Sequence, residues 1–102
     1  MIRLNAFFTV KEGVETSKVL DLAKQLVEKS LKDEGCVSYG IFQSGTDKRV
    51  MMFCETWKDQ ESLDKHSASK HFTTIVPQIE ALTVDGLKCE RFEFPFRKWE
   101  SD

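Results

Sequence analysis

The chain has 102 residues, of which 40% are hydrophobic and 31% are charged, a size and a mixture that fit one globular domain. Its formal net charge is −2 and its lysine and arginine residues are scattered, which argues against nucleic acid as a partner. No apolar run is long enough to cross a membrane. Polar residues interrupt the N-terminal segment at residues 1–10, which argues against the continuous apolar core of a signal peptide. We therefore expect a cytoplasmic protein with no membrane partner.

An alternation of apolar and other residues predicts a first strand over residues 2–10. Its even-numbered side chains are apolar and point to one side, whereas Phe7 points to the other side among polar neighbours. A helix follows, with Thr16 or Ser17 as its cap and apolar residues at steps of three and four. We expect this helix to stop at Gly35, since glycine tolerates the left-handed backbone that ends many helices.

Two more strands are predicted at residues 36–43 and 50–57. The segment between them is rich in turn-forming residues, which indicates an antiparallel hairpin. The second of these strands carries apolar side chains on both of its faces. Such a strand is expected to be covered on both sides.

Two helical stretches come next. Asp59 is placed to cap a short helix that runs to about His66, and a Ser-Ala-Ser sequence at residues 67–69 interrupts the pattern before a second helical run. Pro77 lies inside that second run. Because proline lacks a backbone donor and clashes with the preceding turn, we expect a kink or an early end there.

Asp85-Gly86 predicts a last turn, and residues 87–96 a fourth strand. The order β-α-β-β-α-β is that of a ferredoxin-like α+β fold, in which helices cover one face of a four-stranded antiparallel sheet. We expect this domain to span residues 1–96, with a C-terminal tail at residues 97–102.

The helices can cover only one face of this sheet. The other face would still expose apolar side chains, including Phe7 and one side of the strand at residues 50–57. A large exposed apolar patch usually marks an interface. The sequence therefore predicts a homodimer that forms through the sheet face.

Three polar residues are candidates for chemistry. Glu55 lies between large apolar groups on its strand, so loss of solvation is expected to raise its pKa and suit it to act as a general base. His66 and His71 flank the break at residues 67–69. On one continuous helix their imidazoles would lie about 140° apart, but the break can bring them together.

Each candidate also has a purely structural interpretation. Glu55 could pair with a basic residue across the sheet, His66 could favour the end of its helix, and His71 could be a surface residue. Two histidines and a glutamate at this spacing do not define a metal site. The three cysteines contain no C-x-x-C pair, so we expect reduced thiols and no metal.

Three stretches of this sequence carry a resemblance to a known family: Glu34-Gly35-Cys36 with Tyr39, the run from Phe53 to Asp59, and the run from His66 to Phe72. Over about residues 2–94 the chain resembles the antibiotic biosynthesis monooxygenase (ABM) superfamily of dimeric α+β barrels. The resemblance implies two barrels packed through their sheets, each with a cavity between its helices and its own sheet.

Some members of that superfamily oxidise quinol or phenolic substrates with O2 and need no metal or flavin. The resemblance implies that Glu55, His66 and His71 are catalytic or orienting residues. It likewise implies that aromatic residues contact the substrate or wall the pocket: Tyr39, Trp57 and Phe72. No cofactor is expected.

Haem-degrading relatives offer a contrast. The positions of their distal asparagine, pocket tryptophan and iron-ligating histidine correspond to Ala6, His66 and Val76 here, so the resemblance disfavours haem breakdown. Other relatives isomerise a small phosphorylated signalling sugar derivative. The absence of an evident basic cluster for the phosphate makes that activity a weaker alternative.

The leading hypothesis is a cofactor-independent monooxygenase that oxidises a quinol or phenolic small molecule with O2. The alternative from another class is a non-catalytic dimeric protein that binds a small apolar ligand, because a fold does not by itself determine a function.

Overall fold

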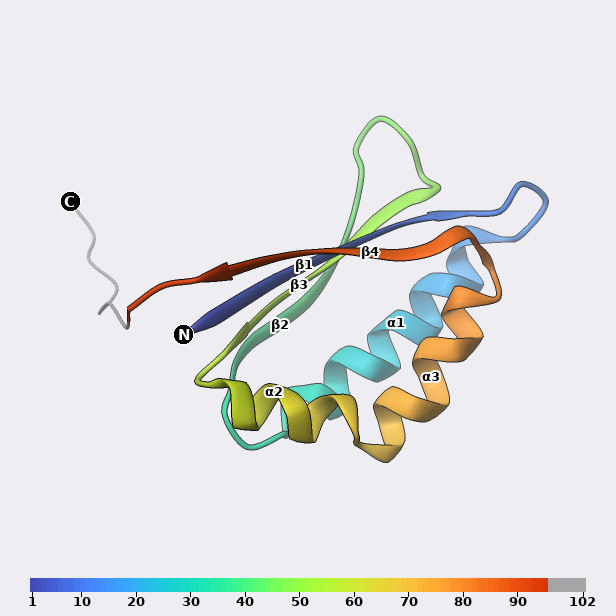
Figure 1. Ribbon diagram of the computed structural model, residues 1–102. Helices are drawn as coiled ribbons and strands as arrows, with labels where there is room; N and C mark the ends of the chain where they lie inside the picture. The colour runs from blue at the N-terminus through green and yellow to red at the C-terminus, as the bar shows by residue number, and fades with distance from the viewer. Residues whose placement is uncertain (96–102) are drawn as a thin grey trace.

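The computed structural model describes residues 1–95, which form four strands and three helices (Figure 1). In chain order the elements are β1 (Ile2–Val10), α1 (Thr16–Ser30), β2 (Cys36–Gln43), β3 (Val50–Trp57), α2 (Gln60–Ser67), α3 (Lys70–Glu80) and β4 (Thr83–Glu93). The predicted tail at residues 97–102 lies outside the described residues. The bounds of β2 and β3 are those predicted from the sequence.

The four strands form one antiparallel sheet in the order β2-β3-β1-β4. All three helices lie on one side of this sheet (Figure 1). This arrangement confirms the expected ferredoxin-like α+β fold, with the second helical stretch divided into α2 and α3.

The face of the sheet under the helices forms the core. Phe8 of β1 and Phe53 of β3 are almost fully buried there, with ring centroids 5.7 Å apart. In the same layer, Leu4 and Tyr39 lie on either side of Glu55 in the strand register. Because side chains alternate along β3, the carboxyl group of Glu55 lies in an apolar layer.

α1 packs on the sheet through a stripe that includes Leu26 and ends at Ser30. The predicted caps were wrong, because Thr16 begins the helix and the N-cap is Glu15, which makes no side-chain hydrogen bond. The helix also ends earlier than expected. Gly35 lies five residues beyond its last residue.

Gly35 nevertheless has a clear structural role. Its φ is +80°, and a Cβ at this position would collide with the side chain of Ser62 in α2. The backbone N–H of Lys58 also donates to the Gly35 carbonyl at 2.8 Å. The segment between α1 and β2 is therefore held tightly against the start of α2.

The predicted break between α2 and α3 is confirmed. Asp59 caps α2 by accepting a hydrogen bond of 2.8 Å from the Ser62 backbone N–H. Ser69 caps α3 through Phe72, and its hydroxyl also donates to the His66 carbonyl at 2.6 Å. The hydroxyl of one serine therefore satisfies backbone groups of both helices and fixes the angle between them.

Pro77 does not end α3, which continues to Glu80. The expectation of an early end was wrong because only one backbone hydrogen bond is lost to the proline. Burial of Ile75, Val76 and Ile79 on either side of Pro77 keeps the helix on the sheet.

The turn expected at Asp85-Gly86 was also wrong. β4 begins earlier, at Thr83, and these two residues lie inside it with φ of 63° and 73°. The register with β1 shifts at this point, between Phe7 and Thr9. The left-handed pair thus forms a bulge within the strand.

The face of the sheet opposite the helices is open in the single chain. It carries side chains that are large, apolar and exposed on three strands: Phe7, Phe42, Val84 and Phe92. Within residues 1–95, no helix has both the length and the apolar character needed to cross a membrane.

Candidate active site

A cavity of about 280 Å³ lies between the helices and the sheet. Its wall is mostly apolar, and all four strands and all three helices contribute to it. The lining residues that have polar atoms are Tyr39, Glu55, Ser67, His66, Glu80 and Cys89. A small, largely apolar cavity with a few polar groups is the usual form of a small-molecule site.

Glu55 enters this cavity from β3. Its side chain is buried, and the indole Nε1 of Trp57 donates a hydrogen bond to its Oε1 at 2.9 Å. Burial raises the pKa of Glu55, and the hydrogen bonds from Trp57 and, more weakly, from Tyr39 oppose that rise without cancelling it. The protonated form of this carboxyl is therefore favoured relative to one in water.

His66 enters the cavity from the last turn of α2 and is only 1% exposed. Aromatic rings surround its imidazole: the centroids of Trp57, Phe72 and Tyr39 lie 4.5, 5.1 and 5.4 Å away. Burial lowers the pKa of His66, and the hydrogen bond and charge of Asp33 oppose that effect. The neutral imidazole is thus the favoured form.

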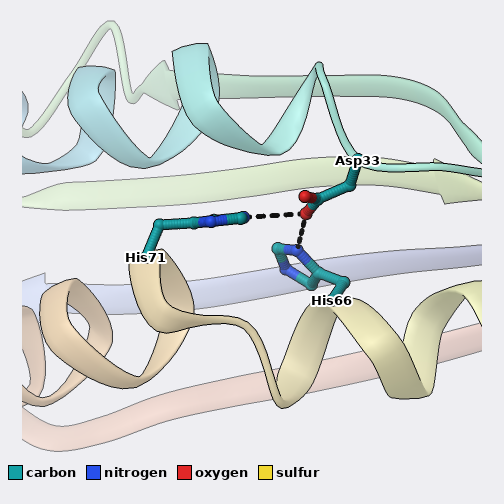
Figure 2. Close-up of side chains that lie close together, drawn as sticks. All are labelled: Asp33, His66 and His71. Carbon is teal, nitrogen blue, oxygen red and sulfur yellow. Dashed lines mark hydrogen bonds and ion pairs between the residues drawn. The ribbon is translucent and has the colours of Figure 1, made fainter.

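Asp33 links the two histidines (Figure 2). Its Oδ2 lies 2.9 Å from Nδ1 of His66 and 2.8 Å from Nε2 of His71. The break between α2 and α3 therefore does bring the imidazoles together, with ring centroids 5.9 Å apart, but around a third residue.

This geometry decides which nitrogen of His66 can act as a base. A carboxylate only accepts hydrogen bonds, so Nδ1 of His66 carries the proton that it donates to Asp33. The lone pair of the neutral ring is then on Nε2. That atom is buried and has no hydrogen-bond partner among residues 1–95. An oriented imidazole with a free lone pair beside a cavity can remove a proton from a bound molecule.

The candidate residues take different places around the cavity. Glu55, His66, Tyr39 and Phe72 line it. Trp57 does not line the cavity, but its indole N–H donates to Glu55 and its ring packs against that of His66. His71 does not line the cavity. It is linked to the cavity through its hydrogen bond with Asp33, which in turn contacts His66.

Asp33 was not found from the sequence. It follows the end of α1 and is 33 positions from His66. Acidic residues near Gly35 are ordinary in a connecting segment, so no local pattern singles Asp33 out. Only the packing of this segment on α2 places the carboxylate beside the histidines.

Two of the cysteines, Cys36 and Cys89, have raised pKa values. Burial, with the nearby charges of Asp33 and Glu55, raises the pKa of Cys36 to about 11. Burial also raises the pKa of Cys89, which lines the cavity. Both groups are thiols rather than thiolates at neutral pH, which disfavours a nucleophilic role for either.

A four-stranded antiparallel sheet with helices on one face and a cavity between the layers defines a ferredoxin-like α+β protein. Residues 1–78 match the family described as antibiotic biosynthesis monooxygenase. The chain belongs to this family.

Named relatives agree with this assignment. YcnE of Bacillus subtilis (strain 168), whose name describes it as a putative monooxygenase, is 29% identical over 93 residues, which cover 91% of this chain and 97% of YcnE. A solved structure described as an antibiotic biosynthesis monooxygenase is 30% identical, with a TM-score of 0.85 and coverage of 93% of this chain and 99% of that one.

A third similar protein comes from Bacteroides thetaiotaomicron VPI-5482 and is described as a conserved protein of unknown function and possible oxidoreductase. It is 43% identical, with a TM-score of 0.84, and the match covers 91% of this chain and 96% of that chain. Together, the family and these names support a general monooxygenase-like function.

Proposed function

We propose that this protein is a cofactor-independent monooxygenase that oxidises a quinol or phenolic small molecule with O2. The observation that carries the proposal is the Asp33–His66 pair: Nδ1 of His66 is held by Asp33, and its unpartnered Nε2 belongs to a buried residue that lines an apolar cavity. A phenol needs a base of this kind to become electron-rich enough to reduce O2.

His66 acts first in the proposed reaction. Its Nε2 takes the hydroxyl proton of the substrate, and the resulting phenolate transfers one electron to O2. The two radicals then combine at a ring carbon, and the proton held by His66 passes to the new peroxide. The apolar wall excludes water, which keeps the phenolate reactive and protects the intermediate.

Glu55 acts in the second half of the reaction. His66 removes the remaining proton from the oxygenated ring carbon while the O–O bond breaks, and the protonated Glu55 supplies a proton to the departing hydroxide. His66 then returns its proton to Glu55. The sum is one substrate and one O2 converted to one quinone product and one water, with the substrate supplying all four electrons.

The aromatic residues and His71 have supporting roles. Tyr39 and Phe72 contact the substrate ring within the cavity, and Trp57 holds Glu55 and packs on His66. His71 donates to Asp33 and so helps to hold the carboxylate against His66.

The test is oxygen uptake with a panel of reduced naphthoquinols and related phenols, together with incorporation of label from ¹⁸O2 into the product. Uptake that exceeds buffer autoxidation, one labelled oxygen atom per product and no hydrogen peroxide are expected. Rates equal to buffer across the panel would contradict the proposal. Peroxide in place of labelled product would indicate simple oxidation instead.

The apolar wall of the cavity also favours the non-catalytic alternative, a binder of a small apolar ligand. In that case binding would persist without product when Glu55 and His66 are both replaced. The isomerase alternative is weaker, because no lysine or arginine among residues 1–95 lines the cavity to bind a phosphate.

We further propose that two copies pack through their open sheet faces. Phe7 on β1, Phe42 on β2 and Phe92 on β4 are 39%, 56% and 50% exposed in the single chain. Burial of these side chains against a second copy would remove apolar surface from water on both partners.

A further inference from the structure

We propose that Asp33, His66 and His71 form a binding site for a divalent transition-metal ion, and that the bound ion changes His66 from a hydrogen-bond acceptor to a donor at the cavity. The proposal of binding stands on the geometry of the three side chains. Its consequence for catalysis rests on the proposed function.

The ligand atoms are of the right kind and are close together. One carboxylate oxygen and two imidazole nitrogens, from three separate segments of the chain, lie within 4.8 Å of one another (Figure 2). A tetrahedral zinc ion holds such atoms at about 2.0–2.2 Å. Such ligand atoms are about 3.3–3.6 Å from one another. Binding therefore requires the contacts of 2.8 and 2.9 Å at Asp33 to lengthen by about half an ångström, and the two imidazole nitrogens, which lie within 4.8 Å of each other, to reach the same spacing.

The charge and exposure of the cluster also favour a cation. Asp33 has two imidazoles as its side-chain partners and forms no ion pair with a lysine or arginine in the described part of the chain. The side chains of Asp33 and His71 are 20% and 16% exposed, whereas that of His66 is 1% exposed. An ion can thus enter from the solvent side, keep water as a further ligand and reach His66 last.

The position of the site relative to the cavity gives the bound ion a specific effect. Asp33 and His71 do not line the cavity, and the ion would occupy the Nδ1 side of His66. A metal on Nδ1 requires the proton of the neutral ring to reside on Nε2 instead. The number of protons on His66 is unchanged, but the cavity now faces an N–H donor in place of a lone pair.

Zinc is the appropriate first probe because imidazole and carboxylate ligands suit it and it has no redox chemistry of its own. Titration of the metal-free protein with Zn²⁺ in a calorimeter is expected to show one site per chain. Asp33→Asn and His71→Gln should each weaken that binding at least tenfold. The matched control Glu34→Gln removes the neighbouring exposed charge and should bind as the wild type does.

A second control addresses the thiols. Cys36 is three residues from Asp33, and Cys36→Ser should leave the Zn²⁺ affinity unchanged if the three proposed side chains are the ligands. A loss of affinity in this variant alone would assign the metal to the thiol and overturn the proposal.

Nitrogen NMR provides a readout that does not depend on activity. The protein has only two histidines, so the spectrum of His71→Gln assigns both imidazoles. Without metal, His66 should show the Nδ1–H tautomer, and with one equivalent of Zn²⁺ it should show Nε2–H. Unchanged imidazole signals at saturating Zn²⁺, or full affinity in both ligand variants, would overturn the site. Metal binding with the tautomer change, but no oxygen uptake by the metal-free protein, would contradict the proposed function alone.

Discussion

Trp57 donates its indole N–H to the buried carboxyl group of Glu55 at 2.9 Å, although the two side chains are only two residues apart on one strand. Both point to the helix side of the sheet because side chains alternate along β3. Trp57 also packs its ring against His66. One aromatic side chain therefore positions both proposed proton-transfer groups.

Replacement of Trp57 by Phe should reduce stability, because it removes a donor from a buried carboxyl group and leaves space at the ring. We expect the free energy of unfolding to fall by about 1–3 kcal/mol in urea denaturation. In the Glu55→Leu background, which removes the acceptor, the same replacement should cost less. Equal costs in the two backgrounds would show that the hydrogen bond makes no energetic contribution.

Glu55 should make stability depend on pH. Burial raises its folded-state pKa above the unfolded value of about 4.3. Its contribution is therefore complete below that unfolded pKa and is lost as the pH rises through the folded pKa. Glu55→Gln cannot ionise, so its stability relative to the wild type should improve as the pH rises above the unfolded-state pKa of Glu55. Urea unfolding at a series of pH values measures this difference, and a constant difference would be inconsistent with a raised pKa.

The three residues of the Asp-His-His cluster should differ in their effect on turnover. If His66 is the general base, His66→Gln should lower kcat by about 10²-fold or more. Asp33→Asn should have a smaller effect, because it leaves the base in place and removes only the charge that orients it. His71→Gln should have the smallest effect. Steady-state oxygen uptake with the best substrate ranks them. A larger loss in His71→Gln than in His66→Gln would reverse the assigned roles.

The proposed dimer can be tested on the open sheet face. Phe7→Asp places a charge on the central strand of that face and should convert a dimer at micromolar concentration to a monomer in light scattering. Leu31→Asp is the matched control, because Leu31 is also apolar and 52% exposed but lies at the end of α1. A monomeric wild type, or a dimer that survives Phe7→Asp, would argue against packing through the sheet.

Gly35→Ala should be destabilising for two reasons. Its φ of +80° is unfavourable for alanine, and the new methyl group would collide with Ser62. We expect a loss of about 1–3 kcal/mol in the free energy of unfolding. Gly45→Ala is the control, because nothing lies within 4 Å of a Cβ there. Similar stability of the two variants would mean that the segment before β2 adapts easily.

Much of the fold follows from local patterns in the sequence. The strand-forming residues at 36–43 and 50–57, with the turn-rich segment between them, predicted both strands with their observed bounds, and Asp59 was correctly assigned as a cap. These features depend on neighbouring residues alone. The incorrect predictions at Asp85-Gly86 and Pro77 concern residues whose backbone is set by packing on other strands and helices.

The sequence by itself determined that Glu55, His66 and His71 were the polar residues to watch and that a break would separate the two histidines. Only the tertiary structure decided that the histidines meet on Asp33 and that Glu55 and His66 share a cavity. The physical reason is that strand alternation and helix caps are encoded over a few residues. The position of a carboxylate in a connecting segment depends on close packing between elements far apart in the chain.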